Sequence, residues 1–121
     1  MAFKDLLAFK KSFALAMRIF ETLKKFPKEE TYSLTDQIRR SSRSVTVNIS
    51  EAYRKRLYPK HFISKLTDSD VENSETQTWL MFAAECNYID KILLEELTAE
   101  SKEIGKLINY MINNLSKFGA N

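Results

Sequence analysis

The sequence predicts an all-α protein, a single antiparallel up-down-up-down four-helix bundle that spans residues 1–121. Only two glycines and two prolines interrupt the chain, too few for the many tight turns of a sheet protein. Apolar residues recur instead at spacings of three and four, the period of a helix with one buried face. A chain of 121 residues with 44% hydrophobic residues can fill one core, so we expect one domain.

The first helix is expected over residues 5–26, because Pro27 cannot continue a helix and disfavours it at the preceding residue. Its apolar stripe consists of Leu6, Phe9, Phe13, Ala16, Met17, Phe20 and Leu23. Leu15, Ile19 and Phe26 lie beside this stripe and widen the apolar sector to roughly 200°, about twice what a monomeric bundle needs. We therefore expect these three side chains to contact another subunit or a long loop.

The second helix is expected to begin at Ser33, whose hydroxyl can accept a hydrogen bond from a backbone N–H of the first turn. It should end between residues 53 and 56. The small side chains Ser41 and Ser42 in its apolar seam permit the close approach of a neighbouring helix.

The third helix, expected over residues 60–86, has a middle segment almost without large apolar groups, residues 67–75. Either this helix bows toward solvent, or its polar side chains face the interior and bond to one another. Asn87 is expected to end it, because asparagine tolerates the left-handed conformation. The fourth helix is expected over residues 90–115, with Gly105 marking a close helix contact.

The residue types needed for catalysis are missing. A di-iron bundle needs two Glu-x-x-His pairs, but the chain has one histidine, His61, with Tyr58 three residues before it. Gly105 and Gly119 are the only glycines, so no phosphate-binding glycine loop exists. We therefore predict a protein that is not an enzyme and has neither a metal nor a cofactor.

The one cysteine, Cys86, excludes an internal disulfide and fits a reducing compartment. The first residues do not form the apolar core of a signal peptide, and no apolar run approaches the ~20 residues of a membrane span. These features predict a cytoplasmic protein that makes no membrane contact.

A basic constellation on the second helix is the strongest functional signal. At about 100° per residue, Arg39, Arg43 and Arg54 fall within about 60° of one another, with Arg40 a little further round. The candidate nucleic-acid-binding residues are Arg39, Arg40, Arg43, Arg54, Lys55, Arg56 and Lys60. Arginine suits phosphate, and a neighbouring tyrosine can stack on a base of RNA or DNA. Alternatively, these side chains face solvent or form salt bridges between subunits with carboxylates such as Glu51 or Glu75.

The charges are unevenly distributed along the chain. Residues 1–60 carry 14 Lys and Arg against 6 Asp and Glu, whereas residues 61–121 carry 5 against 10. This asymmetry indicates either a polarised surface or a contact between acidic and basic surfaces of different subunits. The remaining possibility is that both sets of charges are solvated.

Residues 26–52 resemble the bacterial four-helix bundle family encoded within intervening sequences of 23S ribosomal RNA genes. The positions that match the family pattern are Phe26, Pro27, Glu30, Tyr32, Leu34, Gln37, Arg39, Arg40, Ser44, Val45, Asn48, Ile49 and Glu51. Residues 3–6 and 75–80 are also similar to the family, so the resemblance spans most of the chain. The chain departs from it at Thr46, usually proline, and at Ala52, usually glycine.

The resemblance implies a homopentamer, a ring of antiparallel bundles around a central channel. A distant relative is the accessory protein of diversity-generating retroelements, a basic pentamer that binds nucleic acid and a reverse transcriptase. The expected partners are therefore further copies of the chain and RNA, DNA or a nucleoprotein, with Arg39 and Arg40 as matched candidates. Gln37, Asn48 and Glu51 are expected to hold helices or subunits together. The candidate oligomer interface is thus Leu15, Ile19, Phe26, Gln37, Asn48 and Glu51.

Overall fold

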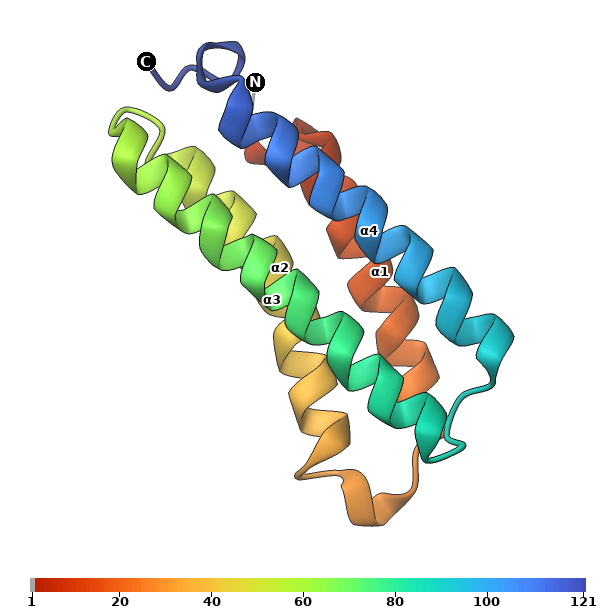
Figure 1. Cartoon of the computed structure of the whole chain (residues 1–121). Helices are drawn as coiled ribbons and strands as arrows, with labels where there is room; N and C mark the ends of the chain where they lie inside the picture. The colour runs from red at the N-terminus through yellow and green to blue at the C-terminus, as the bar shows by residue number, and fades with distance from the viewer. Residues whose placement is uncertain (1) are drawn as a thin grey trace.

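Four helices pack side by side in the structure, a computed structural model that describes residues 2–121 and leaves Met1 of the predicted domain outside. The helices are α1 (Leu7–Leu23), α2 (Leu34–Arg54), α3 (Pro59–Glu85) and α4 (Lys91–Asn113). Successive helices run in opposite directions and are joined by short connections (Figure 1). The described residues contain no strand, so the predicted all-α class is confirmed.

Short 3₁₀ helices flank these elements: η1 (Phe3–Asp5), η2 (Lys28–Glu30) and η3 (Leu115–Phe118). The first helix is shorter than the predicted 5–26, because Leu6 is extended, at φ −65° and ψ 132°, and separates η1 from α1. At its other end α1 stops at Leu23, and Pro27 is extended at ψ 146°.

Helix ends follow the local chemistry, with one correction. Ser33 does not cap α2 through its own hydroxyl; Glu30 Oε1 instead accepts from the Ser33 hydroxyl at 2.5 Å and from the Leu34 N–H at 3.3 Å. A carboxylate near a helix start is favourable because it satisfies orphan N–H groups and complements the helix dipole. At the start of α4, Asp90 accepts from Leu93 N–H at 2.7 Å. Asn87 follows α3 at φ 62°, as predicted.

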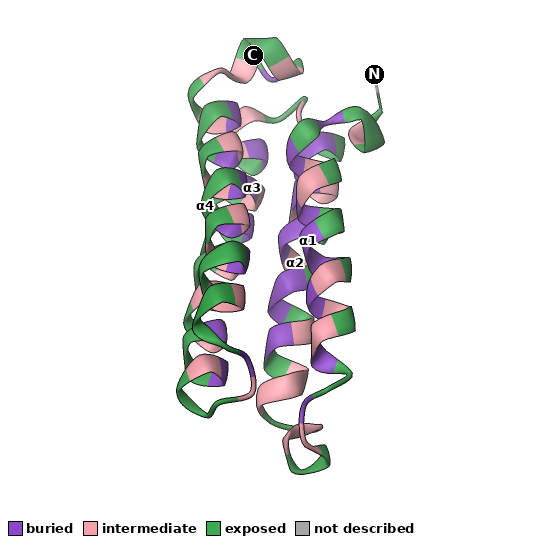
Figure 2. Cartoon of the chain, turned by 90° about the vertical axis from the view of Figure 1, so that its right-hand side faces the viewer, coloured by how far each residue is buried: buried purple, intermediate pink, exposed green. Residues whose placement is uncertain are grey.

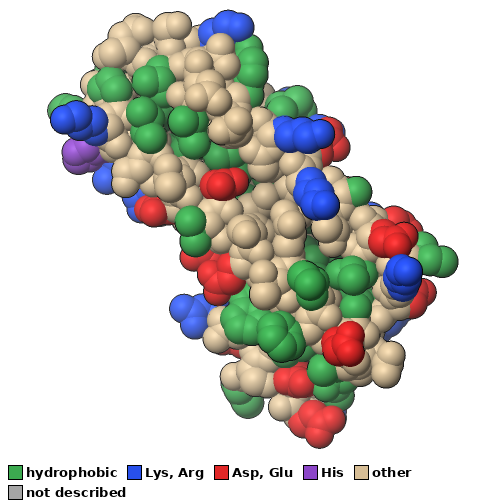
Figure 3. Space-filling view, in the orientation of Figure 1, with side chains coloured by type: hydrophobic (Ala, Val, Ile, Leu, Met, Phe, Trp, Pro, Cys, Tyr) green, Lys and Arg blue, Asp and Glu red, His purple; other side chains and the backbone are tan. Residues whose placement is uncertain are grey.

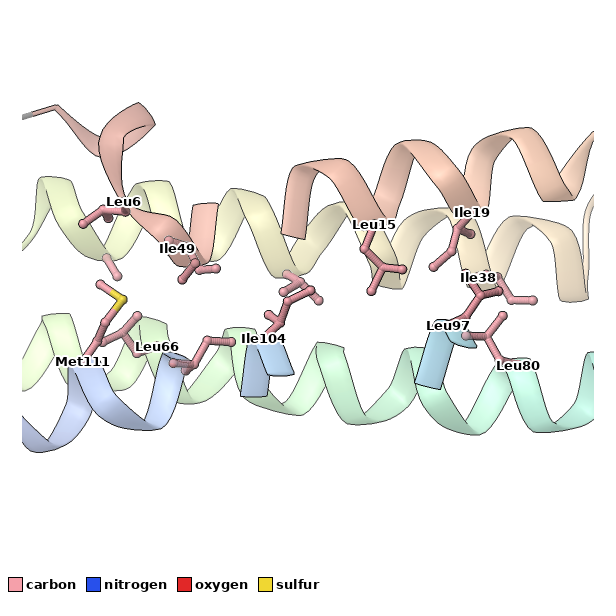
Figure 4. Close-up of a cluster of buried hydrophobic side chains, with 14 of the residues drawn as sticks. Leu6, Leu15, Ile19, Ile38, Ile49, Leu66, Leu80, Leu97, Ile104 and Met111 are labelled. Carbon is pink, nitrogen blue, oxygen red and sulfur yellow. The ribbon is translucent and has the colours of Figure 1, made fainter. Parts of the chain in front are cut away.

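The core of the bundle shows which side of α1 faces inward. Buried residues gather on the faces that the helices turn toward one another (Figure 2). Leu15 and Ile19 lie among these side chains between the helices (Figure 4), with exposed fractions of 4% and 1%. Phe26 is buried as well, and its ring lies 5.3 Å from that of Tyr88. The prediction that these side chains contact another subunit or a long loop is therefore wrong for Leu15 and Ile19, which the helices of one chain cover. Phe26 is covered within the same chain too, where it lies against Tyr88 of the α3–α4 connection.

The other flank of the same apolar sector faces solvent. Phe13 is 53% exposed and Met17 is 45% exposed, although both belong to the stripe predicted to be buried. The width of an apolar sector does not determine which half packs inward. Here the small side chain of Ser12 allows α2 to come close on its side, where Thr46 Oγ1 donates to Ser12 Oγ at 2.9 Å.

A polar layer crosses the middle of the bundle, so the second alternative for the third helix is confirmed. Ser69 on α3 donates to the carbonyl of Val45 at 2.7 Å, and Thr76 donates to Ser41 Oγ at 2.8 Å. These groups are buried, and hydrogen bonds remove most of the desolvation cost that unpaired polar groups would carry. A cavity of about 10 Å³ lies in this region, lined by Ser12, Leu15, Ala16, Ser42, Val45, Asn73, Thr76 and Ile104.

The two ends of the described chain lie at the same end of the bundle as the connection between α2 and α3 (Figure 1). Gly119, at φ 79°, packs against Arg56, and a Cβ added there would lie 3.4 Å from Arg56 Cδ. Ala120 is fully buried, and its N–H donates to the Leu115 carbonyl at 3.0 Å. The C-terminal segment therefore packs on the α2–α3 connection. No helix of residues 2–121 is long and apolar enough to span a membrane.

Candidate nucleic-acid interface

The predicted basic residues fall into two groups along α2. Arg39 and Arg54 are 15 residues apart, which is a rise of about 22 Å at 1.5 Å per residue. Arg39, Arg40 and Arg43 lie in the first half of the helix. Arg54 ends α2, Lys55 and Arg56 lie in the connection to α3, and Lys60 lies in the first turn of α3.

The first group already has partners within the chain. Arg39 Nη2 lies 2.7 Å from Asp36 Oδ1, one turn earlier on the same helix, and Arg40 Nη1 lies 4.0 Å from Asp36 Oδ2. The guanidinium of Arg43 lies over the ring of Phe20 on α1, 5.6 Å from its centroid. Asp36 therefore offsets much of the positive charge at this end of α2.

Two carboxylates on α3, Glu72 and Glu75, which we call the acidic row, weaken the positive potential around Arg40 further. The pKa of Glu72 is raised, mainly by burial and then by the neighbouring carboxylate of Glu75, while Arg40 acts in the opposite direction. The opposing effect of Arg40 shows that its charge acts on this acidic row. A phosphate near Arg40 would therefore also lie near a carboxylate, which reduces its attraction to this part of α2.

At the α2–α3 connection, Arg56 is fixed by internal contacts. Its Nη1 donates to the carbonyl of Tyr53 at 2.8 Å, and its guanidinium lies 4.1 Å from the centroid of the Tyr53 ring. Gly119 packs against its stem. Arg56 is therefore a structural residue that ties the C-terminal segment to α2.

Arg54, Lys55 and Lys60 differ from Arg39 and Arg40, because all three are exposed and none has an ion pair in residues 2–121. Tyr58, 65% exposed, lies between them in sequence, and its ring is 5.8 Å from that of His61. We call these five residues the basic turn. It combines three exposed cations with an exposed aromatic ring in one short segment, and such residue types can contact the backbone and bases of a single strand.

The polar residues expected to hold helices or subunits together have contacts inside one chain. Asn48 Nδ2 donates to the carbonyl of Ser44 at 2.9 Å on its own helix. Glu51 Oε2 lies 2.8 Å from Lys65 Nζ and so joins α2 to α3. Gln37 is exposed. Asn48 and Glu51 therefore stabilise the single bundle, and their use between subunits stays a prediction.

Part of the charge asymmetry is balanced within one chain, by contacts that sequence reasoning missed. Lys11 on α1 lies 2.5 Å from Glu103 on α4. Arg18 bonds two carboxylates of α4, Glu100 at 2.5 Å and Glu96 at 2.6 Å. These hydrogen bonds raise the pKa of Arg18, the bond to Glu96 most. Because the partners are about 80 to 90 residues apart, no local sequence pattern indicates these pairs.

An apolar groove of about 340 Å³ between α1 and α2 is the second surface feature that the sequence did not locate. Its residues are Phe9, Phe13, Ala16, Met17, Arg43, Thr46, Val47 and Ser50. Phe13, Met17 and Val47 are each about half exposed, and Arg43 is the charged residue among them. We call this feature the α1/α2 groove. The wide apolar sector of the first helix was its signal, but the sequence analysis placed the other half of that sector, with Leu15 and Ile19, against another subunit or a loop.

The fold and these surfaces define a small all-α protein of four packed helices with a basic turn at one end and an apolar groove on one side. The chain belongs to the 23S rRNA-intervening sequence protein family, whose model matches residues 4–110. It is similar to a solved structure from Bacteroides thetaiotaomicron, described as a protein of unknown function from the S23 ribosomal protein family. The two are 32% identical, with a TM-score of 0.81, over 91% of this chain and 98% of that one. No curated protein matches the chain.

Proposed function

We propose that this protein is a non-enzymatic nucleic-acid-binding protein that contacts RNA or DNA through the basic turn. The observation that carries the proposal is the exposure of Arg54, Lys55 and Lys60 without carboxylate partners, within a few residues in sequence of the exposed Tyr58. Lys and Arg that neutralise phosphates supply most of the affinity of non-specific binding, and an aromatic ring adds base stacking. Within the predicted set, Arg39 and Arg40 contribute less, because Asp36 and the acidic row of α3 oppose them.

Self-association is the second part of the proposal. The family resemblance implies a homopentamer, and the exposed α1/α2 groove supports a partner subunit, because large exposed apolar patches mark interaction surfaces. A ring would present one basic turn per copy. Several weak contacts on one assembly bind a long polymer far more tightly than one contact does.

A second candidate function is a protein-interaction scaffold without a nucleic-acid role. The pairing of Arg39 with Asp36 and the half-exposed apolar groove favour it, since both fit a protein surface better than a phosphate-binding one. Under this reading the basic turn is solvated.

Binding to fluorescent mixed-sequence RNA and DNA oligonucleotides, measured by anisotropy at low and moderate salt, tests the proposal. We expect the affinity to fall with salt, by a slope of about 0.9 for each phosphate neutralised on duplex DNA. Lys55→Glu/Lys60→Glu should abolish binding. The matched control, Lys102→Glu/Lys106→Glu on α4, changes the net charge equally and should keep most of it. Absent or salt-independent binding, or an equal loss in both variants, would overturn the proposal.

A further inference from the structure

The α1/α2 groove is lined mainly by apolar side chains, with one arginine among them. Phe13 and Met17 from α1 and Val47 from α2 supply the exposed apolar surface. Arg43 is the charged residue in the lining. The groove therefore fits an apolar ridge that carries carboxylates.

The outward side of α3 has the complementary character. Val71, Met81 and Phe82 are each more than half exposed, and a shallow depression of about 240 Å³ lies among Thr78, Met81, Phe82 and Glu85. Hydrophobic and acidic side chains lie close together over the lower part of the molecule, where α3 ends (Figure 3). We call Val71, Glu75, Thr78, Phe82 and Glu85, together with Met81, the α3 ridge.

The spacing and rigidity of this ridge suit a helix that lies in a groove. Val71, Glu75, Thr78 and Phe82 are separated by four, three and four residues, so they share one face of the helix. Trp79 Nε1 donates to Glu75 Oε1 at 3.2 Å, and the rings of Trp79 and Phe82 lie 5.8 Å apart. These contacts hold Phe82 in place before binding, which lowers the entropy lost on association.

We infer that the α1/α2 groove of one copy binds the α3 ridge of a second copy, with Arg43 facing the carboxylates of Glu75 and Glu85. We choose a second copy as the partner because the groove contains an arginine, Arg43, whereas the apolar ridge carries carboxylates, including Glu85. The inference rests on the self-association in the proposed function and assigns the surfaces that make it.

Each copy carries both the groove and the ridge, on different helices, so the contact is head-to-tail. Such a contact forms a ring when the rotation between copies closes, and an open filament when it does not. A head-to-tail contact also has a testable consequence. A copy with a damaged groove keeps its ridge, and a copy with a damaged ridge keeps its groove.

Light scattering of the purified chain over a range of concentrations tests this assignment. The wild type should have a mass that is a multiple of 14.1 kDa. Met17→Glu in the groove and Phe82→Glu in the ridge should each reduce the mass to that of one chain. Leu57→Glu, at an exposed apolar residue on neither surface, is the matched control and should leave the mass unchanged. Circular dichroism checks that every variant remains helical.

An equimolar mixture of Met17→Glu and Phe82→Glu then gives the sharper result. One intact groove and one intact ridge remain, so we expect a species of two chains and nothing larger. A mixture that stays at one chain, or that recovers the full wild-type mass, would overturn the head-to-tail assignment. If the wild type assembles but both single variants keep its mass, the surfaces are wrong and the proposed oligomer stands. A wild type that remains one chain at every concentration would overturn self-association itself, while binding by the basic turn is decided separately by anisotropy.

Discussion

Asn73 on α3 and Ser101 on α4 bond reciprocally across the buried seam between their helices. Asn73 Nδ2 donates to the Ser101 carbonyl at 2.8 Å, and Ser101 Oγ donates to Asn73 Oδ1 at the same distance. Gln77 Nε2 also donates to Ser101 Oγ, at 2.9 Å. The pair holds the polar middle of α3 inside the bundle, where both side chains are buried and little water competes for these hydrogen bonds.

Removing one partner of this pair should cost more than an average hydrogen bond. Ser101→Ala leaves Asn73 Oδ1 buried without its donor, and we expect the free energy of unfolding to fall by about 1–3 kcal/mol. Ser74→Ala, at an exposed position on α3 next to Asn73, is the control and should change this free energy little. Urea unfolding at one protein concentration measures both. In a double-mutant cycle with Asn73→Ala, purely additive losses would show that the two side chains are not coupled.

Gly105 on α4 lies opposite Asn73 without needing to be glycine. A Cβ added there would lie 3.4 Å from Asn73 Nδ2 and 3.9 Å from Asp70 Oδ1, both ordinary contact distances. Alanine is more favourable than glycine in a helix interior by about 1 kcal/mol. We therefore expect Gly105→Ala to raise the free energy of unfolding by up to about 1 kcal/mol in urea. A loss of stability would mean that the Asn73 amide cannot yield to the added methyl group.

Tyr88 and Glu30 join the α3–α4 connection to η2, and the contact should make stability depend on pH. Tyr88 Oη donates to Glu30 Oε2 at 2.8 Å, and this bond is the main reason that the pKa of Tyr88 is raised to about 12. The pKa of Glu30 is lowered, first by the hydroxyl of Ser33 and then by Tyr88. Folding thus favours the protonated tyrosine and the ionised carboxylate.

The sign of the pH dependence follows from linkage between proton binding and folding. An unfolded tyrosine ionises near pH 10, so the stabilisation from Tyr88 is complete below that pH and is lost as pH rises toward 12. The stabilisation from Glu30 is present above its ordinary pKa and is lost as pH falls below it. We expect Tyr88→Phe to lack the alkaline decline relative to wild type when melting temperature is measured against pH. Parallel curves for the two proteins above pH 10 would contradict this account.

The ion pairs between α1 and α4 should contribute little despite their short distances. The side chains of Arg18, Glu96 and Glu100 are each about 40–50% exposed, and exposed pairs are worth at most about 1 kcal/mol and weaken with salt. We expect Arg18→Met to lower the free energy of unfolding by less than about 1 kcal/mol at low salt. The difference should nearly vanish in concentrated salt. A loss that persists there would indicate that the stem of Arg18 contributes through packing instead.

Sequence patterns anticipated most of the fold and part of the candidate site, for identifiable reasons. The four helices follow from apolar periodicity and from Pro27 and Asn87, both of which act locally. The basic turn falls within residues 54–61, so the local sequence alone indicated it. The pairing of Arg39 with Asp36, three residues away, could also have been found by local spacing. The α1–α4 pairs and the side of α1 that faces inward depend on tertiary packing.

Ile19 and Met17 test that last point, because both lie in the apolar sector of α1 but on opposite flanks. Ile19 is 1% exposed, so Ile19→Ala creates a cavity and should lower the free energy of unfolding by about 2–5 kcal/mol at any protein concentration. Met17 is 45% exposed in one chain. If a second copy covers it, the loss caused by Met17→Ala should shrink as the protein is diluted, because an interface stabilises only assembled chains. Thermal unfolding followed by circular dichroism at several protein concentrations measures both losses. If the two variants lose equal stability at every concentration, Met17 lies in the core and the orientation of α1 is contradicted.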